Sequence, residues 1–89
     1  MSAPRPLQSI AQRIDEALQA AVQARRTPVE LVLGKEDYPE FKTWAEAAHG
    51  LNIERGDTYG GVPVRLNAPI FLSCLELAAV PGQPNAIRL

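Results

Sequence analysis

Apolar residues recur at helical spacing near the start of the chain. They occupy positions Leu7, Ile10, Ala11, Ile14, Ala17, Leu18, Ala21 and Val22. Spacings of three and four residues predict an amphipathic helix from Leu7 to Val22, with Pro6 in its first turn. The basic pair Arg25-Arg26 suits the negative end of the helix dipole, and Thr27-Pro28 stops the helix. The apolar stripe fits burial against the domain's own sheet or against a second copy, and the pattern leaves both open.

A short strand and a second helix follow. Val29 to Leu33 is a mostly branched apolar run closed by Gly34, which is typical of a strand. Asp37 and Glu40 have capping-box spacing, so a helix is expected to start there, and Gly50 is placed to end it. One face of this helix carries its apolar side chains, at Tyr38, Phe41, Trp44, Ala45 and Ala48.

After the second helix the apolar period changes to two. Leu51 and Ile53 alternate with Asn52 and Glu54, and Arg55-Gly56-Asp57 then supplies turn residues. A β-hairpin is therefore expected. The tripeptide also spells an integrin-binding sequence, but Gly and Asp serve a turn for conformational reasons, and that interpretation is favoured.

The next predicted strand, Val62 to Leu66, contains Pro63. Proline has no N–H to donate to a ladder, so this strand is expected at an edge of the sheet or beside a bulge at Gly60-Gly61.

The segment from Pro69 to Ala79 fits two structures. Asn67 is a suitable helix cap and the Leu, Glu and Ala content favours a helix, whereas the nearly continuous apolar run also fits a buried strand. The helix is the preferred prediction. Pro81 to Leu89 has no periodicity and is expected to be a flexible tail. The pattern thus predicts a single α+β domain over residues 1–80 with a tail at 81–89.

Composition narrows the class of protein. The 89 residues are 46% apolar and 21% charged, which is typical of one small folded domain with a thin stability margin. A net charge of −1 disfavours nucleic acid as a partner. The start has no signal-like apolar region, and the longest apolar stretch is broken by Glu76, so secretion and membrane insertion are disfavoured. The lone Cys74 lies in an apolar run, as expected for a buried thiol in the cytoplasm.

The sequence contains no phosphate-binding loop, HExxH or CxxC motif, so no enzyme activity, cofactor or metal is expected. His49 is interpreted as a helix-terminal residue rather than a ligand, and the acidic residues Glu36, Asp37 and Glu40 as partners of the helix dipole. Trp44 at helical spacing fits the core better than an exposed recognition stripe.

Contact with another protein is the expected mode of action. Tyr59-Gly60-Gly61 exposes backbone for either a bulge or a partner's strand, and Val62 and Arg65 follow it on the predicted edge strand. Ile14 and Leu18 lie on the stripe of the first helix. These residues are the candidate partner-binding set, and self-association through the helix or the edge strand predicts a homo-oligomer, most simply a dimer.

Residues 29–66 resemble a segment of tailed-phage virion proteins. The resemblance rests on the run Val29 to Tyr38, on a short helix through Phe41 and Trp44, and on Tyr59-Gly60-Gly61-Val62-Pro63-Val64. In phage major capsid proteins and some small phage proteins, a strand ending in an apolar-Gly step leads into an acidic, aromatic-bearing helix. A later strand of those proteins carries aromatic-x-Gly-apolar-Pro-Val.

The resemblance implies a small phage or prophage product. A complete capsid subunit is several hundred residues long and has an extended arm and loop that this chain lacks. The implied role is a minor virion or assembly component, and the alternative is an inhibitor of a bacterial host protein. Either places the chain in the bacterial cytoplasm or the virion, and no catalytic residue carries over.

Overall fold

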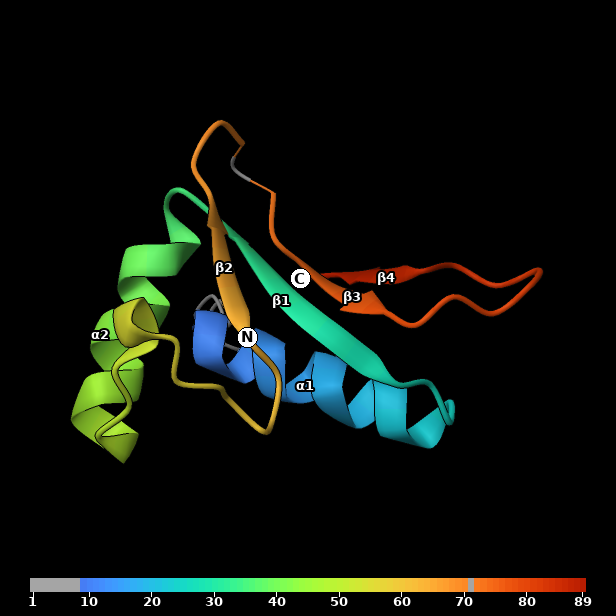
Figure 1. Cartoon of the computed structure of the whole chain (residues 1–89), viewed down its shortest axis with the longest axis horizontal. Coiled ribbons are helices and arrows are strands. Elements are labelled where there is room, and N and C mark those ends of the chain that lie inside the picture. The colour runs from blue at the N-terminus through green and yellow to red at the C-terminus, as the bar shows by residue number, and fades with distance from the viewer. Residues whose placement is uncertain (1–8, 71) are drawn as a thin grey trace, which may run out of the picture.

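The computed structural model describes residues 9–70 and 72–89, which form an α+β domain as the sequence predicted (Figure 1). The elements in chain order are α1 (Ile10–Gln23), β1 (Pro28–Gly34), α2 (Asp37–His49), a 3-10 turn (Ile53–Arg55), β2 (Val64–Asn67), β3 (Cys74–Leu77) and β4 (Ala86–Arg88). Among these residues, no helix is both long and apolar enough to cross a membrane.

A capping box sets the start of α1. The Ser9 hydroxyl accepts a hydrogen bond from the Gln12 amide at 3.2 Å, and the Gln12 side chain accepts one from the Ser9 amide at 3.1 Å. These bonds use N–H groups that the first turn leaves without helical partners, so the helix begins at Ile10. The start predicted at Pro6 and Leu7 falls outside the described residues. The helix ends at Gln23, before the predicted stop at Thr27-Pro28.

The four strands form one mixed sheet in the order β2-β1-β3-β4. β1 pairs in parallel with β2 and antiparallel with β3, and β3 pairs antiparallel with β4. Because α2 connects the parallel neighbours β1 and β2, residues 28–67 form a βαβ unit. The strand predicted from Val62 to Leu66 is β2, which begins at Val64, so Pro63 lies just before it. Its predicted edge position is confirmed, and the Pro63 carbonyl accepts a bond from the Leu31 amide at 2.8 Å.

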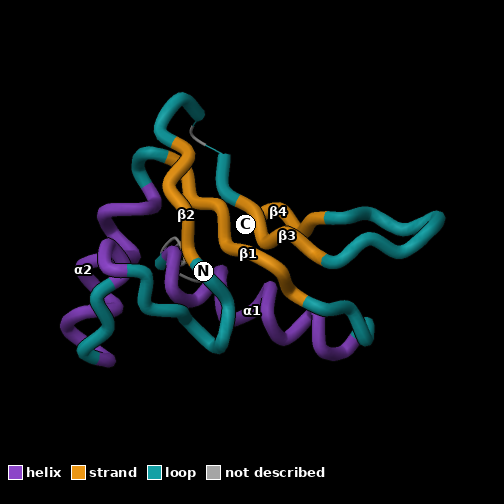
Figure 2. Tube along the Cα trace, viewed as in Figure 1, coloured by secondary structure: helices purple, strands orange, loops and turns teal. Residues whose placement is uncertain are grey.

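Both helices pack on the same face of the sheet (Figure 2). Side chains alternate across a strand, so that face is formed by Leu31 and Leu33 of β1 and by Leu75 and Leu77 of β3. The helices contribute most of the other core residues, Ile10, Ile14, Ala17, Ala21, Phe41 and Ala45, and two turns contribute Ile53 and Val62. The stripe of α1 from Ile10 to Ala21 is therefore covered by the chain's own sheet, the first of the two alternatives, whereas Val22 at its end is 71% exposed.

The hairpin predicted around Arg55-Gly56-Asp57 is wrong. Asn52 accepts a bond from the Arg55 amide at 3.1 Å, and Asp57 accepts one from the Asn52 amide at 2.7 Å. These side-chain bonds favour a tight 3-10 turn over an extended strand. Gly56 closes the turn with φ of +100°, which a side chain would strain.

The helix favoured for residues 69–79 is also wrong, because the segment contains the strand β3. Leu75 and Leu77 are buried and Cys74 and Glu76 are half-buried, which is the period of two expected for a strand. The flexible tail predicted at 81–89 instead contributes β4, whose Ile87 pairs with Leu75. Pairing with β3 orders residues that carry no periodicity of their own.

Arg26 binds the loop of the β3–β4 hairpin, which projects from the body of the domain (Figure 1). Its guanidinium donates to the Ala78 carbonyl at 3.0 Å and to the Gln83 side chain at 3.1 Å. Arg26 is only 9% exposed, whereas Arg25, the other member of the basic pair expected at the helix end, is exposed. A buried guanidinium keeps its charge and needs these acceptors.

Replacing Arg26 with alanine is expected to lower the free energy of unfolding by about 1.5–3 kcal/mol, because hydrogen bonds from a charged donor are lost. Urea denaturation measures this value, and hydrogen exchange should show faster exchange of the Ile87 amide. The matched control is Arg25→Ala, which removes the same charge from an exposed site and is expected to change stability by less than about 0.5 kcal/mol. Equal effects of the two substitutions would contradict the role assigned to Arg26.

Candidate functional site

The face of the sheet opposite the helices is the candidate site. Its side chains come from alternate positions of the four strands, and the helices among the described residues lie on the other face. We call this surface the open face; its strand residues include Glu30, Val32, Arg65, Cys74, Glu76, Ala86 and Arg88. Strand register brings these residues together from segments far apart in the sequence.

Register places the open-face residues in two rows across the strands. In the first row Arg65 pairs with Val32, Val32 with Cys74, and Cys74 with Arg88. This row has apolar residues at its centre and an arginine at each edge of the sheet. It is the basic row of the open face.

The second row lies next to the first and is acidic. Glu30 pairs across the strands with Glu76, and Glu76 pairs with Ala86. Glu30 accepts a hydrogen bond from the Arg65 Nε at 3.0 Å, so its charge is compensated within the chain. Among the described residues, neither Glu76 nor Arg88 has an ion-pair partner. Like charges directly opposite each other disfavour strand pairing, so Glu76 beside Glu30 carries a cost.

A hollow of about 390 Å³ lies on the open face. Val32 and Cys74 lie within the lining, together with Ile70 and Leu72 from the connection between β2 and β3. Leu72 is 57% exposed and Ile70 is 40% exposed, although both side chains are apolar. The hollow therefore has exposed apolar side chains beside charged strand residues, which is the composition of an interface core and its rim.

Cys74 is half-buried on the open face rather than buried in the core. Burial raises the pKa of its thiol above the ordinary value, and the nearby Glu76 carboxylate raises it further. Both effects disfavour the thiolate, which is the reactive form.

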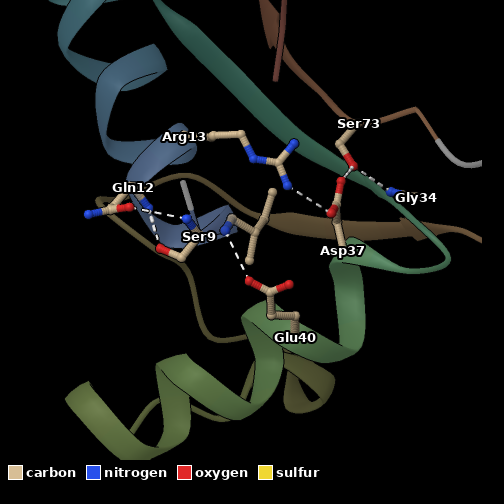
Figure 3. Close-up of polar contacts among 8 residues, drawn as sticks. Ser9, Gln12, Arg13, Gly34, Asp37, Glu40 and Ser73 are labelled. Carbon is tan, nitrogen blue, oxygen red and sulfur yellow. Dashed lines mark hydrogen bonds and ion pairs between the residues drawn. The ribbon is translucent and has the colours of Figure 1, made fainter. Parts of the chain in front are cut away.

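A polar network joins Ser73, the residue before β3, to both helices (Figure 3). The Ser73 hydroxyl donates to Asp37 at 2.5 Å and accepts from the Gly34 amide at 2.8 Å. Arg13 of α1 donates to the same Asp37 carboxylate at 3.0 Å. This network ties the start of α2 to the residue that precedes β3, and so holds the connection that carries Leu72.

The capping box predicted for Asp37 and Glu40 is wrong. The N-cap of α2 is Glu36, whose side chain makes no capping bond. Asp37 instead binds Arg13 and Ser73, and Glu40 accepts a bond from the Ile10 amide at 3.1 Å. The two carboxylates therefore join elements that are separate in the sequence.

The candidate residues at 59–62 form a tight turn. The backbones of Tyr59 and Val62 exchange hydrogen bonds of 2.9 and 3.0 Å, and both central glycines have positive φ, +59° at Gly60 and +79° at Gly61. These angles are those of a type I′ turn, for which two glycines are favoured. Gly60 and Gly61 therefore have a structural role in this chain, in a tight turn and not in the bulge considered from the sequence.

The other candidate residues are divided between the core and the open face. Ile14 is 0% exposed and Val62 is 5% exposed, and both lie in the core, where Leu18 packs against them partly buried. Arg65 alone lies on the open face, with the exposed Gly60 and Gly61 elsewhere on the surface. Ile14 and Val62 are therefore core residues in this fold.

The Tyr59 ring packs against aromatic side chains of α2. It meets Phe41 edge-on at a centroid distance of 5.1 Å and lies 5.7 Å from Trp44 and 5.9 Å from His49. Phe41 is fully buried and Trp44 packs partly buried against the core, which agrees with the interpretation of Trp44 as a core residue. The Tyr59 hydroxyl donates to Asp15 of α1 at 2.6 Å.

The charged residues Glu30, Glu76 and Arg88 and the apolar Leu72 were missed as site residues. The available signal was the alternation of Cys74 and Glu76 with Leu75 and Leu77, which would have placed Glu76 on an outward face if the segment had been interpreted as a strand. Comparisons of the chain with protein-family models, with curated proteins and with solved structures found no match.

Burial and the hydrogen bond to Asp15 raise the pKa of Tyr59 to about 12. The folded chain thus holds this proton more tightly than the unfolded chain, where the pKa is near 10. The resulting stabilisation is complete below pH 10 and is lost as pH rises from about 10 to 12. Ultraviolet titration of a Tyr38→Phe variant isolates Tyr59, and Asp15→Asn in that background should lower the pKa. Ionisation of Tyr59 near its ordinary pKa would contradict the assignment.

Cys74 is expected to react with a thiol reagent several-fold more slowly in the folded chain at neutral pH than in the urea-unfolded chain, because burial disfavours the thiolate. The reaction rate as a function of pH should show an apparent pKa above that of the unfolded control. Equal rates in the two states would show that the fold leaves the thiol unprotected.

Proposed function

We propose that this chain is a non-enzymatic protein-binding domain of a tailed phage or prophage, acting as a minor virion or assembly component. The open face is the surface that makes the contact. In this proposal the helices and the core support the sheet, and the side chains around the hollow meet the partner.

The observation that carries the proposal is the exposed apolar group at the hollow. A sheet with one face in water is ordinary, so the open face alone would say little. Leu72 and Ile70, however, remain 57% and 40% exposed at a hollow of about 390 Å³. Clustered exposed apolar side chains with a charged surround favour contact with another protein.

The phage setting is supported by the resemblance of residues 29–66 to a segment of virion proteins. In the structure these residues are contiguous in space as well as in sequence, because β1, α2 and β2 form a single βαβ unit. The resembling stretches thus belong to one folded piece of the chain.

The chain is expected to co-migrate with phage particles when prophages are induced in the strain that carries its gene. Particles banded in a density gradient and probed with antibody against the chain provide the measurement. Leu72→Asp, at an exposed position of the open face, is expected to reduce co-migration at least several-fold, whereas Thr43→Asp on the exposed side of α2 is the matched control and should not.

Two outcomes would contradict this proposal. Absence of the chain from banded particles, together with capture of one host protein, would favour the inhibitor of a host factor. Co-migration that Leu72→Asp and Thr43→Asp leave equally intact would show that the open face is not the contact.

A further inference from the structure

The charges of the open face are arranged so that the surface complements itself. The basic row ends in Arg65 and Arg88 and the neighbouring acidic row contains Glu30 and Glu76. Glu30 is neutralised by Arg65 within the chain. One carboxylate, Glu76, and one guanidinium, Arg88, are left in adjacent rows of neighbouring strands without ion-pair partners among the described residues.

We propose that the open face is the interface of a two-fold symmetric dimer, in which Arg88 of each copy pairs with Glu76 of the other. The inference rests on the proposed function and deepens it, because it names a second copy of this chain as the partner at that surface. The pair occurs twice, once on each side of the two-fold axis, as in any isologous interface.

The direction of the axis follows from the two rows. An axis between the facing sheets and parallel to the strands would place basic row over basic row and acidic row over acidic row. An axis between the sheets and perpendicular to the strands exchanges the rows, so that the basic row of each copy lies over the acidic row of the other. Opposite charges attract and like-charge juxtaposition is strongly disfavoured, so the perpendicular axis is selected.

The geometry of sheet packing accommodates this arrangement. The strands of the two copies run along the same line under this axis, which is the aligned form of face-to-face packing, with sheets about 10 Å apart. β4 then lies over β4 and β3 over β3, and Arg88 faces Ala86, the cross-strand neighbour of Glu76. A long arginine side chain spans the distance to the next strand, which is about 5 Å.

Apolar contact accompanies the charge pairs. Val32, which is 4% exposed, and Cys74 lie in the hollow. The exposed Ile70 and Leu72 line the hollow from the β2–β3 connection, beyond the basic row on the side away from the acidic row. Facing copies cover these exposed side chains and place the Glu76 carboxylate, which has an acidic neighbour in its own sheet, against a cation. The dimer thus relieves the like-charge pairing of Glu30 and Glu76.

Sedimentation velocity of the full chain under reducing conditions tests the proposal. The wild type is expected to be a dimer at high micromolar concentration and to dissociate on dilution or at high salt, since the charge pairs are partly solvated. Glu76→Arg and Arg88→Glu are each expected to raise the dissociation constant by at least about tenfold. The double variant carrying both substitutions restores opposite charges and is expected to recover most of the lost affinity.

The matched control is Glu46→Arg, which makes the same charge reversal on the exposed surface of α2 and should leave the dimer intact. Circular dichroism and thermal melting confirm that each variant folds, and Glu76→Gln replaces Glu76→Arg if the reversal unfolds the chain. The neutral variant should weaken the dimer less than the reversal does.

A monomeric wild type at high micromolar concentration would overturn the proposal. So would a dimer that weakens equally with Glu46→Arg, or one that neither single reversal affects, which would place the contact elsewhere, for example at the β2 edge. Co-migration of a monomeric chain with virions would leave the proposed function intact while this inference fails. A charge-dependent dimer absent from virions would uphold this inference and reject the phage role.

Discussion

Burial of alternate side chains of β1 and β3 against both helices holds this domain together. Leu31, Leu33, Leu75 and Leu77 face the same way, and α1 and α2 must share that face. Each buried leucine contributes roughly 1.5–3 kcal/mol relative to exposure, which is a large contribution to the stability of so small a core. Because the helices share one face, the opposite face of the sheet carries, within the part of the chain that the structure describes, strand side chains and residues of the β2–β3 connection.

The polar network around Asp37 follows from this arrangement. The two helices begin close together above the sheet, and Arg13 of α1 and Ser73 of the β2–β3 connection both reach the same carboxylate. Asp37 lies in the first turn of α2, where the helix dipole favours a negative charge. One residue therefore serves the dipole, the contact between the helices and the placement of the segment that presents Leu72.

Local signals in the sequence were sufficient for β1 and α2. The bounds of α2 agree with the prediction, although Asp37 and Glu40 make no capping box, and the left-handed Gly50 is the local device that ends the helix. The edge position of β2 also followed locally, from Pro63. The apolar stripe of α1 was predicted, but the surface that covers it was not, because the pattern of a helix carries no information about its packing partner.

Elements that depend on distant partners were not predictable in the same way. β3 has a composition that favours a helix, and pairing with β1 overrides that preference. Ile87 becomes ordered only because Leu75 lies opposite it. Predicting that Glu76 lies beside Glu30 would require knowledge of the strand register. Most of the candidate site is therefore created by tertiary contacts that local sequence patterns do not reveal, whereas the helices and β1 could be predicted from local patterns.

The central position of β1 has a consequence for the rate of folding. Leu31 pairs with Val64 on one side and with Leu75 on the other, so both partners of the central strand lie far along the chain. Each pairing requires a long loop to close. The chain loses conformational entropy in that closure before the contacts between the strands can stabilise it. The helices form in about a microsecond, but the sheet must wait for these closures. The chain should accordingly fold more slowly than a helical bundle of the same length, with the transition state formed when β1 first captures a distant partner.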